Sequence, residues 1–518
     1  MNLLDINPTR AGELGLKSLR SRLSKRASAI TLVTILAAIF SLGCGPVADN
    51  QLVVLKKPGL PVIYYRVMIN AGSALDPVDK PGLAYFTANL LDKGTRNLSR
   101  ADIERRLNQI GAEISISVDK EVVVVSGRTL SENAGEFYSI FREILTEPAF
   151  SDDEIRKAIT DQIDQIGRVR EDDAQLSLAV FENAIFDGHR YGHVVEGAED
   201  AVRNFNRRDV VEFYHANYLR GNVLAGIGGD IEDSLVERFK TDLGNLPSGK
   251  VVRSDVAPKL PKTPKVILVE KENRTQAQLR VGHVLEDNRT SPQYYPMRLL
   301  GCYLGEHREM FGRLFQTVRA ERGLAYGAYA YIEHFRPAGW SKLMENGIPR
   351  TDQYFHMWSY PKEINFEFCV KLMLTEMTKL TTTPLTAEEI DRTKDYVANN
   401  SAFAMETPDR QLGMRLDEKW YNIPDYVDKF KANINRVPRS ELQSIALDNL
   451  HPGSVLIVAV VSDGEAAKRE LLTPDTKLEL PSGSVEGDLQ SVNDQIKALD
   501  LKLLPEDITI VKAAAMFK

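Results

Sequence analysis

Hydrophobic and polar residues follow two different periods along most of the chain. Val62–Ile69 (VIYYRVMI) is a short apolar and β-branched run of the kind that forms a buried strand. Between Leu98 and Ile110 apolar residues recur at the spacing of a helix with one buried face. Segments of both kinds alternate, which predicts an α/β protein, an α+β sandwich of mixed β-sheets packed with helices.

Two stretches of this pattern occur twice, about half a chain apart. Asn217–Leu224 (NYLRGNVL) matches Asn449–Leu456 (NLHPGSVL) without a gap, and each is followed by an apolar strand and an acidic turn. Phe150–Ile155 (FSDDEI) corresponds in the same way to Leu385–Ile390 (LTAEEI). Repeats in the same order at a fixed spacing predict two homologous domains.

The second repeat also contains a helix start signal in both copies. Ser151 and Thr386 are suited to be N-caps, and Glu154 and Glu389 follow three residues later. This spacing is typical of a capping box, in which cap and glutamate satisfy each other's backbone amides. A helix is therefore expected to begin at each position.

The first 45 residues have a different character. Basic residues precede an uncharged apolar run, Ala27–Leu42, that stops at Gly43-Cys44-Gly45. A basic segment followed by a short apolar one indicates an export signal. Ser41-Leu42-Gly43-Cys44 resembles a bacterial lipobox, which implies lipidation of Cys44 and, with Gly45 rather than Asp next, the periplasmic side of the outer membrane of a Gram-negative bacterium. An uncleaved N-terminal anchor is the alternative, and it also places the bulk outside the cytoplasm.

Composition and charge narrow the class of partner. Hydrophobic residues make up 43% and charged residues 26%, as in soluble globular proteins. Removal of residues 1–43 takes away six Lys or Arg and two Asp or Glu, so the net charge moves from −7 to −11. An acidic chain of this kind is not expected to bind nucleic acid. Beyond Cys44 only Cys302 and Cys369 remain. Two cysteines do not make a disulfide framework, but the sequence leaves open whether these two form a disulfide.

The breaks in pattern divide the chain into five segments. Leu246 to Pro264 is rich in Pro, Gly and charge and has no apolar period, so the domain boundary is expected there. The tail after Leu472 opens with a polar loop but ends in apolar residues, and its end is expected to pack. The predicted segments are a lipoprotein signal peptide (1–43), an N-terminal domain (44–247), a linker (248–264), a C-terminal domain (265–472) and a C-terminal extension (473–518).

Several short motifs occur in one order along the chain. The motifs are NAGSALD at 70–76, GLAYFTANLLDKGT at 82–95, EPAF at 147–150, FDGHRYGHVVEG at 186–197, Gly229-Asp230 and RGLAY at 322–326. Together they resemble the insulinase/pitrilysin family of zinc metallopeptidases, in the two-domain form of the processing peptidases, over roughly residues 50–470.

The zinc-binding residues of that family are absent from this chain. Active members carry H-x-x-E-H, in which two His bind zinc and the Glu acts on the metal-bound water. This chain has Tyr85, Ala88 and Asn89 in those places. A further Glu ligand of the family would fall near Asp164, which is the nearest carboxylate and is out of register. The first half is therefore predicted to hold no zinc and no catalytic base.

Histidines elsewhere offer no clear replacement. Among the eight, only His189 and His193 have the i, i+4 spacing of a helical metal pair. They lie in Gly188–His193, whose two glycines favour a loop, and the family has a similar loop without metal ligands. A structural or surface role is favoured over a metal role. The sequence contains no G-x-S-x-G, P-loop or dinucleotide-binding motif.

The second half keeps residues that the resemblance connects with substrate. In active complexes of the family, the domain facing the zinc supplies an Arg and, seven residues later, a Tyr. Arg319 and Tyr326 have that spacing, and both are donors that can stabilise an oxyanion. Arg322 is outside this register. The alternative is that Arg319 is a solvated helix residue and Tyr326 a core aromatic. Gly301–Arg308 replaces a glycine-rich loop of some relatives, so no flexible loop is expected there.

The resemblance implies a non-catalytic subunit. We expect a heterodimer in which a partner with an intact H-x-x-E-H holds the zinc and this chain, inactive alone, helps to bind peptides or unfolded segments by strand addition at a sheet edge. A purely structural subunit of a membrane-associated complex is the alternative. A single-chain enzyme with another mechanism is a third hypothesis, but the sequence contains no recognisable set of catalytic residues for it.

Overall fold

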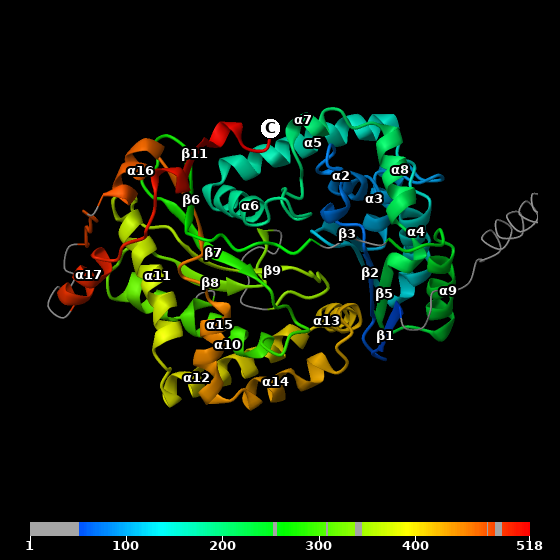
Figure 1. Ribbon diagram of the computed structural model, residues 1–518. Coiled ribbons are helices and arrows are strands. Elements are labelled where there is room, and N and C mark those ends of the chain that lie inside the picture. The colour runs from blue at the N-terminus through cyan, green and yellow to red at the C-terminus, as the bar shows by residue number, and fades with distance from the viewer. Residues whose placement is uncertain (1–50, 252–255, 307–308, 337–343, 474, 482–488) are drawn as a thin grey trace, which may run out of the picture.

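The computed structural model describes residues 51–251, 256–306, 309–336, 344–473, 475–481 and 489–518. Its two mixed β-sheets lie side by side and carry helices (Figure 1). The predicted signal segment and Cys44 lie outside the described residues. In the part of the chain that the structure describes, no helix is both long and apolar enough to cross a bilayer.

The first sheet has five strands in the order β1-β5-β2-β4-β3. The predicted strand Val62–Ile69 is confirmed as β2, which pairs antiparallel with β4 and β5 while β1 lies parallel to β5. Tyr65, Val67 and Ile69 of β2 are buried, because they point into the core under the first half's helices. The strands are β1 (Leu52–Lys56), β2 (Val62–Ile69), β3 (Glu113–Val118), β4 (Val123–Leu130) and β5 (Val223–Gly229).

The second sheet repeats this arrangement and adds one strand. Its order is β11-β6-β10-β7-β9-β8, so β6 to β10 follow the topology of β1 to β5. The sixth strand comes from the C-terminal extension and lies parallel to β6, which confirms that the end of the chain packs. The strands are β6 (Lys265–Glu270), β7 (Gln278–Leu285), β8 (Ala328–Ile332), β9 (Gln353–Ser359), β10 (Leu456–Val461) and β11 (Ile508–Lys512). The predicted α/β class with two homologous domains is confirmed.

Helices pack against both sheets in the two halves. The first half contains α2 (Leu83–Asn89), α3 (Arg100–Gln109), α4 (Ala134–Thr146), α5 (Asp152–Glu171), α6 (Asp173–Ile185), α7 (Glu199–Val202), α8 (Arg207–Asn217) and α9 (Asp233–Gly244). The second half contains α10 (Tyr294–Gly305), α11 (Phe366–Thr382), α12 (Ala387–Asn400), α13 (Pro408–Tyr421), α14 (Tyr426–Arg436), α15 (Leu442–Asn449), α16 (Gly464–Leu472) and α17 (Gln490–Lys497). Between α9 and β6 the described residues form neither helix nor strand.

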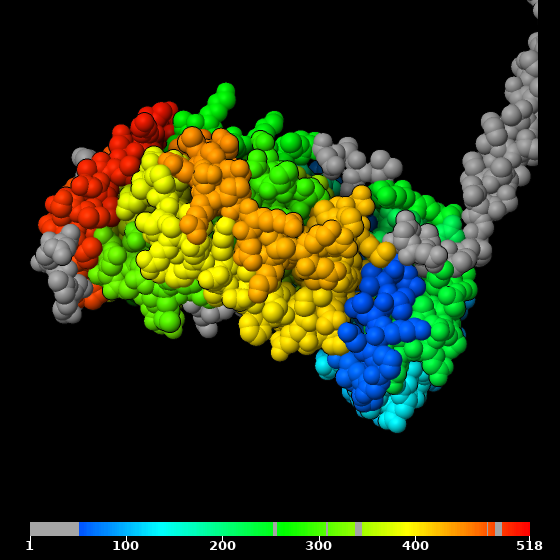
Figure 2. Space-filling view, turned by 90° about the horizontal axis from the view of Figure 1, so that it is seen from below, coloured from blue at the N-terminus to red at the C-terminus, as the bar shows by residue number. Residues whose placement is uncertain are grey.

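The two halves exchange one helix each. Helix α6 of the first half packs on β7 and β10 of the second sheet, and α13 of the second half packs on β1, β2 and β5 of the first. In Figure 1 the cyan α6 accordingly lies beside the second sheet and the gold α13 reaches the blue strands. Figure 2 shows the yellow and orange surface of the second half meeting the blue surface of the first, with the red extension at the far end. Each sheet is thus covered partly by the other half, which ties the two together.

One helix start and one capping box differ from the predictions. The helix expected from Leu98 begins at Arg100, because Ser99 caps it through the backbone amide of Asp102. Thr386 forms the complete capping box with Glu389, as predicted. At the other copy Ser151 caps α5, but the prediction of a full box is wrong. The Glu154 carboxylate contacts Lys157 at 2.6 Å and Arg100 at 3.5 Å instead of the cap amide.

Candidate functional site

The degenerate motif forms α2, whose N-terminus is held by neighbouring segments. The Asp76 carboxylate accepts hydrogen bonds from the backbone amides of Gly82 and Ala84, both at 2.7 Å. Gly82 has φ +94°, and a Cβ there would lie 2.5 Å from the carbonyl oxygen of Glu196. Glycine is therefore required at this position. Three of the family-like motifs thus meet at the N-terminus of α2, through Asp76, Gly82 and Glu196.

The three motif side chains of α2 interact with protein groups. Ala88 is fully buried, and Tyr85 and Asn89 are half-buried. Burial raises the pKa of the Tyr85 hydroxyl, the negative charge of Glu196 adds to this, and a hydrogen bond with Asn89 partly opposes it. A neutral phenol bonded to a carboxamide offers neither a usual zinc ligand nor a base. The residues present do not fit a zinc ion.

Helix α5 supplies no replacement ligand. Asp164 is exposed, so the carboxylate nearest the expected position faces solvent. The α5 side chain that reaches α2 is Gln162, which donates to the carbonyl oxygens of Gly82 at 3.1 Å and Glu196 at 2.7 Å. Within the described ranges, no group of three or more His, Cys, Asp or Glu side chains is placed to hold a metal ion.

The two histidines at helical spacing have separate partners. His189 lies 3.3 Å from the Asp352 carboxylate, and its Nδ1 accepts from the amide of Tyr191. His193 instead contacts the Asp76 carboxylate at 3.0 Å, beside the start of α2. The segment is a loop, as its glycines indicated. These contacts support a structural role for both.

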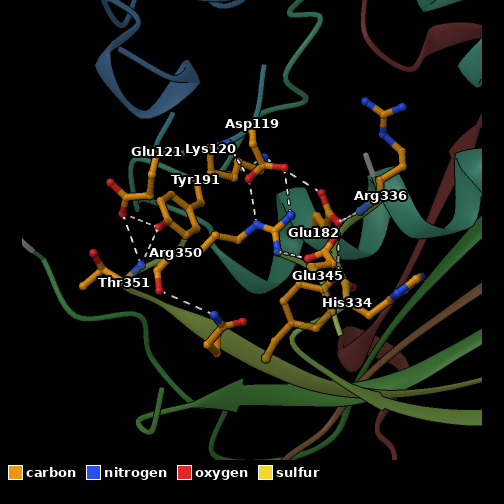
Figure 3. Close-up of polar contacts among 12 residues, drawn as sticks. Asp119, Lys120, Glu121, Glu182, Tyr191, His334, Arg336, Glu345, Arg350 and Thr351 are labelled. Carbon is orange, nitrogen blue, oxygen red and sulfur yellow. Dashed lines mark hydrogen bonds and ion pairs between the residues drawn. The ribbon is translucent and has the colours of Figure 1, made fainter. Parts of the chain in front are cut away.

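Buried charges link the two halves close to this site, as Figure 3 shows. Arg350 donates two hydrogen bonds to the Asp119 carboxylate, at 2.7 and 2.8 Å, and also contacts Glu345. Burial alone would raise the pKa of Asp119, but the Arg350 guanidinium outweighs it and the pKa is lowered. Asp119 lies between β3 and β4, whereas Arg350 precedes β9. We call Asp119, Glu345 and Arg350 the interlock.

A second buried pair lies beside the degenerate motif. Arg336 of the second half contacts the Glu196 carboxylate, and its backbone amide donates to Glu182 of α6 at 2.6 Å. Both charges act on the hydroxyl of Tyr85. The neighbourhood of α2 is thus occupied by an internal ion pair. Sequence reasoning missed this pair, since its members are 140 residues apart and belong to no motif.

Arg319 and Tyr326 come together at the surface of the second half. The Arg319 guanidinium carbon lies 4.0 Å from the centre of the Tyr326 ring and 4.9 Å from that of Phe315. Its Nη1 donates to the backbone carbonyl of Tyr326 at 3.3 Å. The Tyr326 side chain is 63% exposed, so it is not a core aromatic. Stacking and this hydrogen bond hold the guanidinium in place beside the exposed ring.

The competing arginine has a different environment. Arg322 is 1% exposed and donates to the side chain of Asn493 and the backbone carbonyl of Thr317. It is therefore a structural residue. Arg319 itself lies in a π-helical segment, Phe315–Ala320, which sequence reasoning did not predict. Such segments occur often at functional sites.

The two cysteines and one edge of the first sheet are further features that the sequence predicted. Cys302 and Cys369 are both buried and free, so no bridge joins them. Burial raises the pKa of the Cys369 thiol to about 12, which makes it a poor nucleophile at neutral pH. Strand β3 is an edge of the first sheet, and Glu113, Ser115 and Ser117 on it are exposed. That edge is the kind to which an extended peptide can add.

Comparisons with known proteins agree with these observations. The sequence model described as "Insulinase (Peptidase family M16)" matches residues 52–198, and the one described as "Peptidase M16 inactive domain" matches residues 204–397. A Bacillus subtilis protein named "Uncharacterized zinc protease YmxG" is 23% identical over 56% of this chain and 69% of its own length. "Non-peptidase homolog YmxG" of Helicobacter pylori is 19% identical over 76% of this chain and 85% of its own.

Solved structures show the same fold. A peptidase M16 inactive domain from Pseudomonas fluorescens superposes with a TM-score of 0.70 at 20% identity, over 80% of this chain and 96% of that one. A protease from Helicobacter pylori superposes with a TM-score of 0.69 at 17% identity, over 80% and 98%. Fold, motif order and family matches lead to one conclusion: the chain belongs to the insulinase family, peptidase family M16, as a member that has lost the zinc-binding motif.

Proposed function

We propose that this chain is the non-catalytic, substrate-binding subunit of a heterodimeric zinc metalloendopeptidase. Arg319 and Tyr326 would act in trans on a zinc site held by a partner of the same family with an intact H-x-x-E-H. The substrates would be peptides or unfolded segments. The observation that carries the proposal is the stacked and accessible Arg319–Tyr326 pair in a chain whose own motif offers no ligand.

The geometry of the pair suits the stabilisation of a carbonyl oxygen. A guanidinium fork and a phenol can both donate to a developing oxyanion without being nucleophiles. Stacking on Phe315 and Tyr326 limits the rotamers of Arg319, so little entropy is lost when it binds substrate. The pair is therefore preorganised for charge stabilisation and leaves bond cleavage to the partner's zinc.

Peptide binding would use main-chain contacts. Strand β3 forms an edge of the first sheet, and its alternate residues Glu113, Ser115 and Ser117 are exposed. Strand addition at such an edge reads the peptide backbone, which fits substrates that share extended conformation rather than sequence.

The test replaces the pair in the purified two-chain complex. Arg319→Ala and Tyr326→Phe should leave assembly and the partner's zinc intact, because neither residue is a ligand. Loss of a preorganised donor should lower peptide turnover by about 10²–10³, or by about tenfold if the donor is only partly used.

The matched control is Arg439→Ala. Arg439 is an exposed arginine of the same half, paired with Asp391 at 2.6 Å, so its loss removes the same charge away from the pair. It should change turnover little. Normal turnover of both test variants in a correctly assembled complex would contradict the proposal and favour a purely structural subunit.

We further propose that Cys44 carries a lipid that holds the chain at the periplasmic face of the outer membrane. The basis is the lipobox-like Ser41–Cys44 after the apolar run. Cys44→Ala should abolish acyl labelling and release the protein from membranes, since one substitution removes the acyl attachment point. Membrane retention that persists in Cys44→Ala would show instead that the apolar segment is the anchor, and persistent acyl labelling would place the lipid on another residue.

A further inference from the structure

The C-terminal extension packs beneath the turn that separates Arg319 from Tyr326. Helix α17 of the extension lies against α11 of the second half. The Lys371 ammonium of α11 is buried and donates to the Thr476 hydroxyl at 2.7 Å and to the Lys497 carbonyl oxygen at the end of α17 at 3.0 Å. Polar contacts inside the protein thus fix α17 in place.

One side chain of α17 reaches the segment that holds Arg319. Asn493 is 3% exposed, and its Oδ1 accepts a hydrogen bond from Arg322 Nε at 2.9 Å. The same guanidinium donates through Nη1 to the Thr317 carbonyl oxygen at 2.8 Å, inside the π-helical segment. Asn493, Arg322 and Thr317 therefore form a continuous chain of hydrogen bonds from the extension to the turn of helix that contains Arg319.

Pro481 of the extension lies close to the same turn, next to Gly323. Gly323 has φ +61°, a left-handed conformation that favours glycine. A Cβ at this position would lie 2.9 Å from Cγ of Pro481, which belongs to the extension. The extension thus meets this turn at two successive residues, through a hydrogen bond at Arg322 and through the nearby Pro481 at Gly323.

We propose that Asn493 is a positioning residue for the Arg319–Tyr326 pair. By fixing Arg322 it sets the path of the turn, and the path of the turn sets the stacking of the guanidinium on the Tyr326 ring. The extension would then be a built-in support for the substrate-binding pair, supplied by a part of the chain beyond the two family matches. The value of the pair for turnover rests on the proposed function, whereas its geometry does not.

The first test measures that geometry in the isolated full-length chain. Fluorotyrosine placed at position 326 gives a ¹⁹F resonance that reports the guanidinium over its ring, and Arg319→Ala gives the reference for an unstacked ring. Asn493→Leu removes the acceptor at similar size. Its resonance should move towards the Arg319→Ala position or split into several signals. Asn493→Asp keeps an acceptor oxygen and should restore the parent resonance.

The control is Asp494→Ala, on the exposed face of the same helix. It removes a contact with Gln490 at 2.9 Å and leaves Arg322 untouched, so the resonance should not move. If Asn493→Leu does not accumulate as folded protein, the smaller Asn493→Ala serves the same test. A folded acceptor-free variant with the parent resonance would overturn the proposal.

Turnover in the complex separates this inference from the proposed function. Asn493→Leu should lower turnover by about tenfold, since displacement of a positioned group by about 1 Å can cost more than that. Suppose that the resonance moves in Asn493→Leu but Arg319→Ala has normal turnover. The positioning role of Asn493 would then stand, and the proposed role of Arg319 in catalysis would be refuted. Suppose instead that the resonance does not move in Asn493→Leu but Arg319→Ala has slow turnover. The positioning role of Asn493 would then be refuted, and the proposed role of Arg319 in catalysis would stand.

Discussion

The two sites that the family would use for catalysis differ in how accessible their side chains are. At the first, Tyr85 bonds to Asn89, Ala88 is fully buried, and the Glu196–Arg336 ion pair lies alongside. At the second, the Tyr326 ring is 63% exposed and Arg319 stacks upon it. We call the first the closed site, because contacts within the chain occupy its motif side chains, and the second the open site, because its Tyr326 ring is exposed to solvent.

Under the proposed function, this contrast would separate the loss of zinc chemistry from general decay, because the second site keeps an exposed phenol beside a stacked guanidinium. The interlock stabilises the common scaffold on which both sites are built. Variants that act on the interlock, on the closed site or on the open site should therefore have distinct effects.

The largest effect on stability is expected at the interlock. Arg350→Ala leaves the buried Asp119 carboxylate and the partly buried Glu345 carboxylate without their main cation. The free energy of unfolding should fall by about 3–5 kcal/mol, measured by urea denaturation. Arg439→Ala, which breaks an exposed pair, should cost about 0–1 kcal/mol. Equal costs would show that the interlock does not join the halves.

A smaller effect should depend on pH. Burial raises the pKa of Glu345 to about 7, although Arg350 opposes the rise. The folded state then binds a proton that the unfolded state has released between about pH 4.5 and pH 7, so this group lowers stability as pH rises through that window. Asp119, Arg289 and Arg350 are the charged groups that face it.

Glu345→Gln isolates this contribution. The stability of the variant relative to the parent should increase by about 1–3 kcal/mol between pH 5 and pH 8, in parallel urea titrations. A relative stability that stays constant, or that falls as pH rises, would show that Glu345 is ionised throughout and that the Arg350 ion pair dominates its burial.

The smallest effect is expected at the closed site. Asn89→Ala removes one hydrogen bond to Tyr85 and should cost about 0.5–1.5 kcal/mol of stability. Turnover in the complex should not change, because no reacting group is near. A large fall in turnover with normal stability would mean that the degenerate motif still contacts substrate, and the contrast between the two sites would disappear.

Local features of the fold could be predicted from the sequence, and distant ones could not. Strand β2 has its predicted bounds, because a short run of apolar and β-branched residues favours a strand through local preferences alone. The contact between Arg319 and Tyr326 could also be expected, because the two residues are only seven positions apart in the sequence. The interlock joins Asp119 to Arg350, 231 residues away, and the exchange of α6 and α13 likewise depends on tertiary packing. The capping box predicted at Ser151 does not form, because the Glu154 carboxylate contacts Arg100 and Lys157 instead of the backbone amide of Ser151.

Zinc analysis tests the central claim most directly, which is that this chain binds substrate while another chain holds the metal. The purified full-length chain, after dialysis against metal-free buffer and re-exposure to zinc, should retain no stoichiometric zinc and cleave no peptide, because Tyr85, Ala88 and Asn89 provide no ligand set. The complex with its partner should retain about one zinc ion. About one tightly bound zinc ion in the isolated chain would contradict the account.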